Sequence, residues 1–274
     1  MERASKYLSS VHFFGNGEHA RESDSMAIVN ATFYSAALGK QCQMNVILPD
    51  TGKPPFPVYY LLHGRSDDYS AWMRWTRIEN YVSNRPMVVL MPDGFLGFYC
   101  YNVEGGPYAK YMLEAVVGFV EKTFPVQKQR GGRCIGGLSM GGYGAVHLAL
   151  LRPEMFASAN SHSGALAHGS KHVTVKGNAD YERVFGKGSA TIGSVRDLFA
   201  QAAKLKKKGA RLPKLRIDCG TEDFLLEHNR LYHAHLEALR IPHEYQEFPG
   251  PHEWNYWDLH VREALDFHAK ALRS

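Results

Sequence analysis

Short apolar runs alternate with helical segments along most of this chain, and this alternation limits the possible folds more than any other feature. The runs 58–64 and 86–94 are nearly continuous apolar stretches, typical of strands buried on both faces, and 132–138 is a further short strand. Segments with apolar residues at helical spacing follow at 108–124 and 140–151. Strands joined by crossover helices form a parallel sheet, so the sequence predicts an α/β fold with a mostly parallel central sheet and helices on both faces.

The remaining segments extend this pattern toward both ends of the chain. Two early runs, 27–38 and 42–49, are joined by the short polar turn GKQ and predict an antiparallel hairpin on the N-terminal side. The segment 67–84 opens with Asp and Ser residues that suit a helix N-terminus, so we expect a helix there. Further predicted strands cover 156–164, 214–220 and 243–250, and further predicted helices cover 224–240 and 254–272.

The length of 274 residues suits either one large domain or two small ones. No internal repeat and no Pro/Gly/Ser linker divides the chain, so we expect a single domain over residues 1–274. With 45% hydrophobic and 22% charged residues, the chain can bury a sizeable core. The longest irregular stretch, 165–194, lies between predicted strands, where an insertion is either a substrate-facing loop or small cap, or surface decoration.

Charge and hydropathy exclude several classes of protein. The net charge of +5 is mild, and the one basic run, 204–216, lacks interleaved aromatic residues, so we expect a solvated helix end rather than nucleic-acid binding. No segment approaches 18 consecutive apolar residues, so no membrane span is expected. The N-terminal segment 1–26 carries charge but no apolar stretch of signal-peptide length, so we expect no export signal.

The cysteines indicate a reducing compartment. Cys42, Cys100, Cys134 and Cys219 are far apart and form no C-x-x-C pair, which argues against a zinc site and against a disulfide framework. Cys134 and Cys219 lie inside predicted strands. We therefore expect buried, reduced thiols in a cytoplasmic protein.

The stretch GGLSMGGYG, residues 136–144, places Ser139 between a predicted strand and a predicted helix. In that context G-x-S-x-G forms a sharp turn that exposes a serine hydroxyl at the carboxyl edge of a sheet. The turn is strained, so its neighbours two positions away, Gly137 and Gly141, must be small. The first amide of the helix, that of Met140, points toward the same place, where the helix dipole favours developing negative charge.

Two further interpretations compete with a nucleophilic serine. A dinucleotide-binding loop needs G-x-G-x-x-G in the first strand-to-helix turn, whereas this stretch comes late in the chain. Chance occurrence of so short a motif is the more serious competitor, so partner residues must decide. Gly142 and Gly144 are predicted to let the helix pack closely against the sheet, and Gly136 has no predicted role.

A nucleophilic serine needs a base to accept its proton and a carboxylate to hold the tautomer of that base. In this architecture the chain order is serine, acid, histidine. Of the 14 histidines, His252 lies in a Pro/Gly loop between the last strand and the last helix, at the same sheet edge as Ser139. We therefore predict that His252 is the base.

Most of the other late histidines are expected to be solvent-facing or packing residues. The pair His233 and His235 is spaced i, i+2, so the two side chains would not share a helical face for a metal. This group of solvent-facing or packing histidines comprises His228, His233, His235, His243, His260 and His268.

The stretch LRIDCGTEDF offers Asp218, Glu222 and Asp223 as the acid. Asp218 lies within the predicted strand, where it is partly buried or caps a neighbour. Asp223 lies in the loop after that strand, from which a carboxylate can reach a histidine in the next such loop. Asp223 is the predicted acid, and Glu222 is its nearest rival.

The tetrahedral intermediate needs a second backbone donor, because losing one donor typically costs about 3 kcal/mol. The stretch LLHGRSDD, residues 61–68, ends a strand with His-Gly, where a tight turn can present the N–H of Arg65 inward. His63 lies beside this turn and early in the chain, so we expect a structural role for it rather than that of the base.

Five separated blocks occur in the order of a known family: LLHGRSDDYSAW, GLSMGGYGA, SGAL, CGTEDFL and GPHEWNYW. Together they resemble the esterase branch of the α/β-hydrolase superfamily, which includes esterase D (S-formylglutathione hydrolase), the antigen 85 acyltransferases and feruloyl esterases. The resemblance extends from about residue 28 to the C-terminus. The chain is most similar to the small bacterial acetyl or tributyrin carboxylesterases of this branch.

The resemblance implies an α/β-hydrolase fold and the same site residues that spacing indicates. Ser139 would be the nucleophile, Asp223 the acid and His252 the base, with the amides of Arg65 and Met140 as the oxyanion hole. The chemistry needs no metal and no organic cofactor, and its partner is a small-molecule ester. Small esterases of this kind often associate, so the resemblance also suggests a homo-oligomer.

The expected activity is hydrolysis of short-chain acyl esters through an acyl-enzyme. The segment 93–108 does not reproduce the Gly-Ala-Gly-rich loop usual in glutathione-thioester hydrolases, so S-formylglutathione hydrolase is only the runner-up. The same fold also serves thioesterases of another kind, carbon-carbon hydrolases, feruloyl or acetyl-xylan-type esterases and non-catalytic binding proteins, so these classes stay open. The acyltransferases are exported, so mycolyl transfer is not expected.

Aromatic residues near the predicted sheet edge are candidates for the wall of the acyl or alcohol pocket, together with the insertion 165–194. The short distance between the serine turn and this insertion suggests an open, shallow site for short acyl chains. The candidate aromatic residues are Trp72, Phe95, Phe98, Tyr99 and Tyr101.

Overall fold

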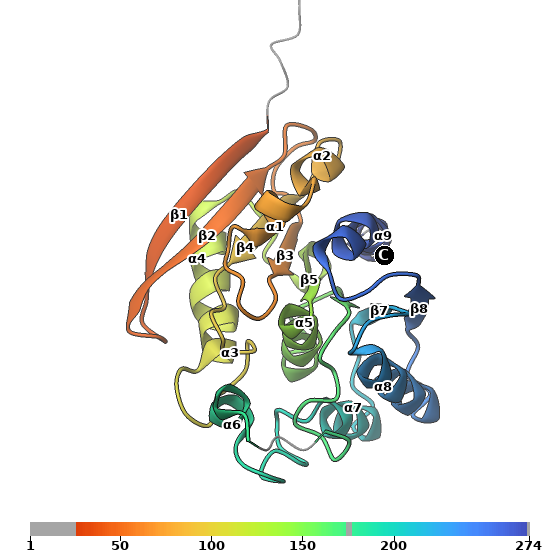
Figure 1. The fold of residues 1–274 in the computed structure, drawn as a ribbon. Coiled ribbons are helices and arrows are strands. Elements are labelled where there is room, and N and C mark those ends of the chain that lie inside the picture. Colours follow the sequence, from red (N-terminus) through yellow and green to blue (C-terminus); the bar gives the residue numbers. More distant parts are fainter. Residues whose placement is uncertain (1–25, 174–176, 273–274) are drawn as a thin grey trace, which may run out of the picture.

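The computed structural model describes residues 26–173 and 177–272. Within these ranges one eight-stranded sheet has the order β1-β2-β4-β3-β5-β6-β7-β8, with β1 and β8 at opposite edges (Figure 1). The strands are β1 (Ala27–Ser35), β2 (Lys40–Leu48), β3 (Val58–Leu62), β4 (Val88–Pro92), β5 (Arg133–Leu138), β6 (Ser158–His162), β7 (Lys214–Gly220) and β8 (Glu244–Phe248).

The sheet is mostly parallel with an antiparallel N-terminal hairpin, as the sequence predicts. β1 pairs with β2 antiparallel, and β2 pairs with β4 in the same sense. From β4 through β3, β5, β6 and β7 to β8, every pairing is parallel. The carboxyl ends of these parallel strands therefore meet at one edge of the sheet, where the loops after β5, β7 and β8 come together.

Helices cover both faces of the sheet. They are α1 (Ala71–Trp75), α2 (Ile78–Val82), α3 (Tyr108–Lys110), the π-helical η1 (Tyr111–Val116), α4 (Val117–Thr123), the 3-10 turn η2 (Arg130–Gly132), α5 (Met140–Leu151), α6 (Ala179–Phe185), α7 (Leu198–Lys207), α8 (Leu226–Ala238) and α9 (Trp254–Leu272). None of the described helices is both long and apolar enough to cross a lipid bilayer.

The central strands have two buried faces, which explains their continuous apolar runs. Tyr60 and Leu62 of β3 pack in one hydrophobic cluster with α4, α5, α7 and α8. Tyr59 and Leu61 point the other way, into a second cluster with α1, α2 and α9. Every residue of β3 is buried, because alternate side chains of one strand serve opposite faces.

The single helix predicted over 67–84 is wrong, since the structure has two short helices there. Thr76 adopts an extended conformation after α1, and its hydroxyl donates to the carbonyl of Trp72. The same hydroxyl accepts from the N–H of Ile78, and the N–H of Arg77 donates to Asp258 of α9 at 2.8 Å. Side chains thus replace the helical hydrogen bonds at this point and separate α1 from α2.

Several element boundaries differ in smaller ways. The hairpin turn covers 36–39 rather than GKQ, because Gly39 adopts a positive φ of 66° and its N–H donates to the carbonyl of Ser35. The segment 108–124 is helical as predicted, with a π-helical middle. The insertion 165–194 contains the helix α6, and the basic run 204–216 begins in the last turn of α7, as expected for a helix end.

Candidate active site

Ser139 lies at the junction of β5 and α5 in a conformation that side-chain-bearing residues rarely adopt, with φ 53° and ψ −113°. Backbone hydrogen bonds on both sides hold it there. Its N–H donates to the carbonyl of His162 at 2.9 Å, and its carbonyl accepts from the N–H groups of Tyr143 and Ala165, each at 3.1 Å. The strained turn is therefore fixed by β6 and by the chain that follows it.

The glycines beside Ser139 leave space that a side chain would fill. A Cβ on Gly137 or on Gly141 would lie 2.5 Å from the carbonyl oxygen of Leu62, closer than real Cβ contacts come. The prediction that both positions must be small is therefore confirmed. A Cβ on Gly142 would lie 2.6 Å from the hydroxyl of Ser161 in β6, as expected for close packing of helix on sheet.

Two further glycines have roles that the sequence did not indicate. Gly144 faces the ring of Tyr99 and not the sheet, so the prediction for this residue is wrong. Gly136 leaves space for the hydrogen bond that the Tyr59 hydroxyl donates to Asn160 at 2.8 Å, because a Cβ on Gly136 would clash with both side chains.

The structure brings the three predicted triad residues into hydrogen-bond distance. Nε2 of His252 lies 3.0 Å from Oγ of Ser139, and Nδ1 of His252 lies 2.8 Å from Oδ2 of Asp223. The Asp223 side chain is fully buried, while that of His252 is 15% exposed. A buried carboxylate that accepts from Nδ1 leaves the Nε2 lone pair to accept the serine proton, which is the arrangement general-base catalysis requires.

The surroundings of Asp223 keep it ionised. Burial raises its pKa, but hydrogen bonds from His252, from the N–H of Leu225 and from the hydroxyl of Ser163 outweigh burial, so the pKa of Asp223 lies below its ordinary value. The Leu225 N–H donates to Oδ1 at 2.7 Å, which leaves Oδ2 for His252. The two carboxylate oxygens therefore have separate donors.

The rival carboxylates have partners of their own. Glu222 is exposed, and its carboxylate accepts from the N–H of Gly250 at 2.5 Å and from the hydroxyl of Thr221 at 2.8 Å. Asp218 is buried in β7, where it pairs with Arg216 and, at 2.9 Å, with Nδ1 of His162. Neither contacts His252 in this arrangement.

Ser163 was missed as a site residue, although it lies in the SGAL block. It is fully buried with a positive φ of 48°, and its N–H donates to the carbonyl of Asp218 at 2.7 Å. The hydroxyl donates to Asp223 and accepts from Nε1–H of Trp257 at 3.2 Å. Ser163 thus links α9 to the predicted acid, Asp223.

Aromatic rings flank the imidazole of His252. Trp257 meets it edgewise, with ring centroids 4.8 Å apart, and Phe224 packs against it with centroids 4.5 Å apart and planes tilted by 51°. Phe224 is 75% exposed, which is unusual for so large an apolar side chain in contact with a buried network. In the sequence, only its position directly after Asp223 could have indicated that Phe224 belongs to this site.

The two predicted oxyanion donors lie beside Ser139. Met140 is the first residue of α5, so its N–H has no acceptor within the helix. A Cβ on Gly64 would lie 3.7 Å from Cβ of Ser139, so the turn that carries Arg65 adjoins Ser139. Across residues 26–173 and 177–272, no hydrogen-bond acceptor is found for the N–H of Arg65 or of Met140.

His63 has the structural role expected of it. Its Nε2 accepts from the N–H of Gly94 at 2.8 Å, so the neutral ring carries its proton on Nδ1, which lies 2.8 Å from the carbonyl of Gly64. The hydroxyl of Tyr99 donates to the His63 carbonyl at 3.2 Å. These bonds hold the turn that presents Arg65.

The side chain of Arg65 connects this turn to the insertion. Its guanidinium lies 2.5 Å from Asp180 of α6 and 5.5 Å from the ring centre of Tyr181. Both partners of the ion pair are only partly exposed, at 35% for Arg65 and 40% for Asp180. The insertion 165–194 is therefore attached to a residue that also supplies a candidate oxyanion amide.

Three of the five aromatic residues expected to line the acyl or alcohol pocket are buried. Trp72 is 1% exposed and donates from Nε1 to the carbonyl of Leu62, and Phe98 and Tyr99 are equally buried. They belong to the packing beneath the site, so the prediction for them is wrong. Phe95 and Tyr101 are exposed.

Known proteins with similar sequences and structures include esterases and serine hydrolases. The Esterase family, described as "Putative esterase", matches residues 35–268. An acetyl esterase of Caldicellulosiruptor saccharolyticus is 31% identical over 263 residues, which are 89% of this chain and 99% of that protein.

Two solved structures from Staphylococcus aureus are similar over nearly the same range. The fluorophosphonate-binding serine hydrolase F has a TM-score of 0.82 and 30% identity, covering 89% of this chain and 98% of its own. The S-formylglutathione hydrolase has a TM-score of 0.80 and 30% identity, covering 89% and 99%.

Proposed function

The chain belongs to the Esterase family and is a serine carboxylesterase of small-molecule esters, and from this premise we propose that Ser139, His252 and Asp223 hydrolyse short-chain acyl esters. One observation carries the assignment of residues: the continuous hydrogen-bonded path from Oγ of Ser139 through His252 to Asp223. The 31% identity to a protein named an acetyl esterase supports a short acyl chain.

In the acylation step, Oγ of Ser139 attacks the ester carbonyl while Nε2 of His252 takes its proton. The negative charge that develops on the carbonyl oxygen faces the amides of Arg65 and Met140, and Asp223 stabilises the imidazolium. The imidazolium then returns its proton to the alkoxide that leaves, so an alcohol departs and an acyl-enzyme remains.

In the deacylation step, water takes the place of the alcohol. Nε2 of His252 removes a proton from this water, whose oxygen attacks the acyl carbonyl of the enzyme ester. When the second tetrahedral intermediate collapses, the proton moves from His252 to Oγ of Ser139. The acid is released and the starting state of the triad is restored.

The first test is the hydrolysis of p-nitrophenyl acetate, butyrate and octanoate by purified full-length protein. We expect kcat/KM to be highest for acetate or butyrate, and Ser139→Ala to lower kcat by about 10⁴-fold or more. Equal rates for the wild type and Ser139→Ala would exclude Ser139 as nucleophile. A maximum at octanoate would contradict the short-chain proposal alone.

The second test separates the two neighbouring carboxylates. Asp223→Asn should lower kcat by about 10⁴-fold, because the amide would no longer hold the required tautomer of His252. Glu222→Gln should change kcat less than about threefold, since Glu222 bonds to Gly250 and Thr221. The opposite ranking of these two variants would show that Glu222 is the acid.

A thioester is the second candidate substrate, favoured by the 30% identity to the staphylococcal S-formylglutathione hydrolase. The same triad can attack a thioester, because only the leaving atom differs. Comparison of kcat/KM for S-formylglutathione, acetylated sugars, feruloyl esters and simple acetates decides between the candidates. A value for S-formylglutathione more than about 100-fold above the acetates would make it the preferred substrate.

We also propose that residues 1–274 form one domain, and that the chain acts in the cytoplasm. The four cysteines are free and buried, which supports a reducing compartment. That the chain forms a homo-oligomer stays a prediction, which light scattering after size-exclusion chromatography can check.

A further inference from the structure

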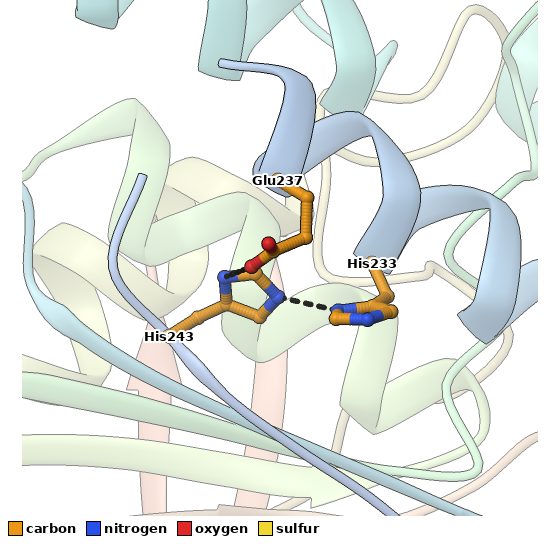
Figure 2. A group of neighbouring side chains, drawn as sticks. All are labelled: His233, Glu237 and His243. Carbon is orange, nitrogen blue, oxygen red and sulfur yellow. Dashed lines mark hydrogen bonds and ion pairs between the residues drawn. The ribbon is translucent and has the colours of Figure 1, made fainter. Parts of the chain in front are cut away.

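A second group of potential ligands lies at the start of β8, whose other end leads to His252. His233 and Glu237 are one helical turn apart on α8, and His243 lies immediately before β8. Figure 2 shows His243 between the other two side chains, with Nε2 toward His233 and Nδ1 toward Glu237. One ligand atom from each of the three lies within 4.8 Å of the others. As its i, i+2 spacing predicts, His235 does not join His233, because its Nε2 lies 2.9 Å from the carbonyl of Phe199. The partner of His233 comes from the next segment of the chain.

The two imidazoles face each other through nitrogen atoms. Nδ1 of His243 lies 2.8 Å from the carbonyl of Ile241, so this nitrogen carries the proton and donates to that carbonyl. Nε2 of His243 then has a free lone pair, and it lies 2.7 Å from Nδ1 of His233 (Figure 2). The bond from a second ring nitrogen to a backbone carbonyl is the support that histidine ligands of metals usually have.

Both rings are held in place before any ion binds. The His243 side chain is only 1% exposed. The ring of His233 stacks on Tyr245 of β8, with centroids 4.1 Å apart and planes 6° from parallel.

The third side chain supplies an anionic oxygen. A carboxylate oxygen of Glu237 lies 3.9 Å from Nδ1 of His243, and the side chain is 66% exposed, so it is free to turn toward the two facing nitrogens. Two imidazole nitrogens and one carboxylate oxygen form a donor set that Zn²⁺ binds in proteins, with water in the fourth position.

We propose that Nδ1 of His233, Nε2 of His243 and the carboxylate of Glu237 bind a Zn²⁺-type divalent ion. The ion takes the place of the proton now shared between the two rings, and that proton moves to Nε2 of His233, so both imidazoles stay neutral. The facing nitrogens must separate slightly from 2.7 Å, because two nitrogens bonded to Zn²⁺ at about 2.0 Å in tetrahedral geometry lie about 3.3 Å apart.

Such an ion would link α8 to the start of β8, because its ligands come from both. The helix α8 follows the loop of Asp223, and β8 leads into the loop of His252, so the ion would stabilise the two elements that carry the acid and the base. It lies at the opposite end of β8 from His252 and takes no part in the ester chemistry. The proposal therefore does not depend on the proposed function.

The test is calorimetric titration of tag-free, chelator-treated full-length protein with ZnCl₂ at pH 7.5. We expect about one ion per chain with a Kd below about 10 μM, and a rise in Tm of about 5 °C at hundredfold excess over Kd. His233→Phe keeps an aromatic ring on Tyr245 and removes a ligand, and Glu237→Gln removes the anionic oxygen. Each should weaken binding at least tenfold.

His172→Ala is the matched control, because His172 is an exposed histidine outside the group. It should bind Zn²⁺ like the wild type. A wild-type Kd above about 100 μM, or unchanged binding by His233→Phe, would overturn the proposal and leave a hydrogen-bonded histidine pair. The metal-free Tm of each variant shows that it is folded, and no readout requires esterase activity.

Discussion

Phe224 packs against the imidazole of His252, with ring centroids 4.5 Å apart, although three quarters of the phenylalanine is exposed to solvent. Trp257 also packs against this imidazole, edgewise, and is buried. The candidate base therefore contacts one ring that belongs to the core and one that solvent or substrate can reach. An exposed apolar ring beside a reacting group offers a surface for an apolar part of the ester.

We expect Phe224→Ala to raise KM for p-nitrophenyl esters about three- to tenfold and to leave kcat within about threefold. Covering part of such a ring is worth about 1 kcal/mol, which corresponds to roughly a fivefold change in binding. Steady-state kinetics with p-nitrophenyl acetate and with the more polar glyceryl triacetate measure the effect. The loss should be larger for the aromatic ester.

Leu259→Ala is a suitable control for Phe224→Ala, because Leu259 is also a large exposed apolar residue, at 52%, but lies on α9 outside the contacts of the triad. It should leave both kinetic constants unchanged. If Phe224→Ala behaves like Leu259→Ala on both esters, the exposed ring has no part in substrate binding.

Ser163→Ala should lower kcat about 10- to 100-fold with little change in KM. The hydroxyl donates to Asp223 and accepts from Trp257, so its loss frees the candidate acid to move and leaves a buried indole N–H unpaired. We expect a fall in Tm of a few degrees as well. Ser161→Ala is the matched control, because the buried Ser161 hydroxyl has no partner among the described residues, and it should change kcat less than twofold. Equal kinetics for the two variants would exclude a positioning role for Ser163.

Local spacing predicts the parts of this site that local geometry controls. The turn at Ser139 needs small residues at fixed offsets, and parallel strands bring the loops after β5, β7 and β8 to one edge. The loops of Arg65, Asp223 and His252 could therefore be placed from chain order, although spacing alone did not separate Asp223 from Glu222. The alternating fold followed from the same reasoning, because continuous apolar runs indicate strands with two covered faces.

The parts that spacing could not predict depend on partners far away in the chain. Trp257 reaches Ser163 across 94 residues, and Asp258 accepts from Arg77 across 181 residues, which helps to separate two helices where one was expected. Gly144 likewise leaves space for a ring of another segment, and His243 approaches His233 from outside its helix. Such long-range contacts leave no pattern of apolar residues within a single segment, so sequence periodicity could not predict them.

The ion pair between Arg65 and Asp180 links the insertion to the candidate oxyanion turn. Asp180→Asn should lower kcat/KM about three- to tenfold, because the turn that presents the Arg65 amide loses its anchor on α6. The Tm should change by less than about 2 °C, since partly exposed ion pairs contribute about 0–1 kcal/mol to stability. Kinetics at 50 mM and 500 mM NaCl should show a smaller difference at high salt.

Asp266→Asn removes a comparable ion pair, in which the Arg85 guanidinium lies 2.7 Å from Asp266 on α9. It should leave kcat/KM unchanged and so serves as the control for Asp180→Asn. Equal values for these two variants would mean that the insertion does not support the oxyanion turn.

Buried histidines make the fold sensitive to acid. His147 of α5 is fully buried, stacks on Tyr143 at 5.7 Å, and bonds through Nδ1 to Gln201 at 3.2 Å. Burial lowers the pKa of His147 to about 4, and burial likewise lowers the pKa of His268 to about 3. The unfolded chain has histidines with a pKa of about 6.5, so it binds protons that the folded state does not.

The contribution of these histidines to the free energy of unfolding should therefore be complete above pH 6.5. It should decrease as the pH falls from 6.5 toward the folded-state pKa of each histidine. Between pH 7 and pH 5, each such histidine should lower the free energy of unfolding by about 2 kcal/mol. Urea unfolding at the two pH values can measure this decrease.

His147→Phe removes one titrating group and keeps a ring against Tyr143. The free energy of unfolding of this variant should therefore decrease between pH 7 and pH 5 by about 2 kcal/mol less than that of the wild type. His172→Phe changes an exposed histidine and should show the wild-type loss. An identical pH dependence for His147→Phe and the wild type would show that His147 is protonated in the folded state at pH 5.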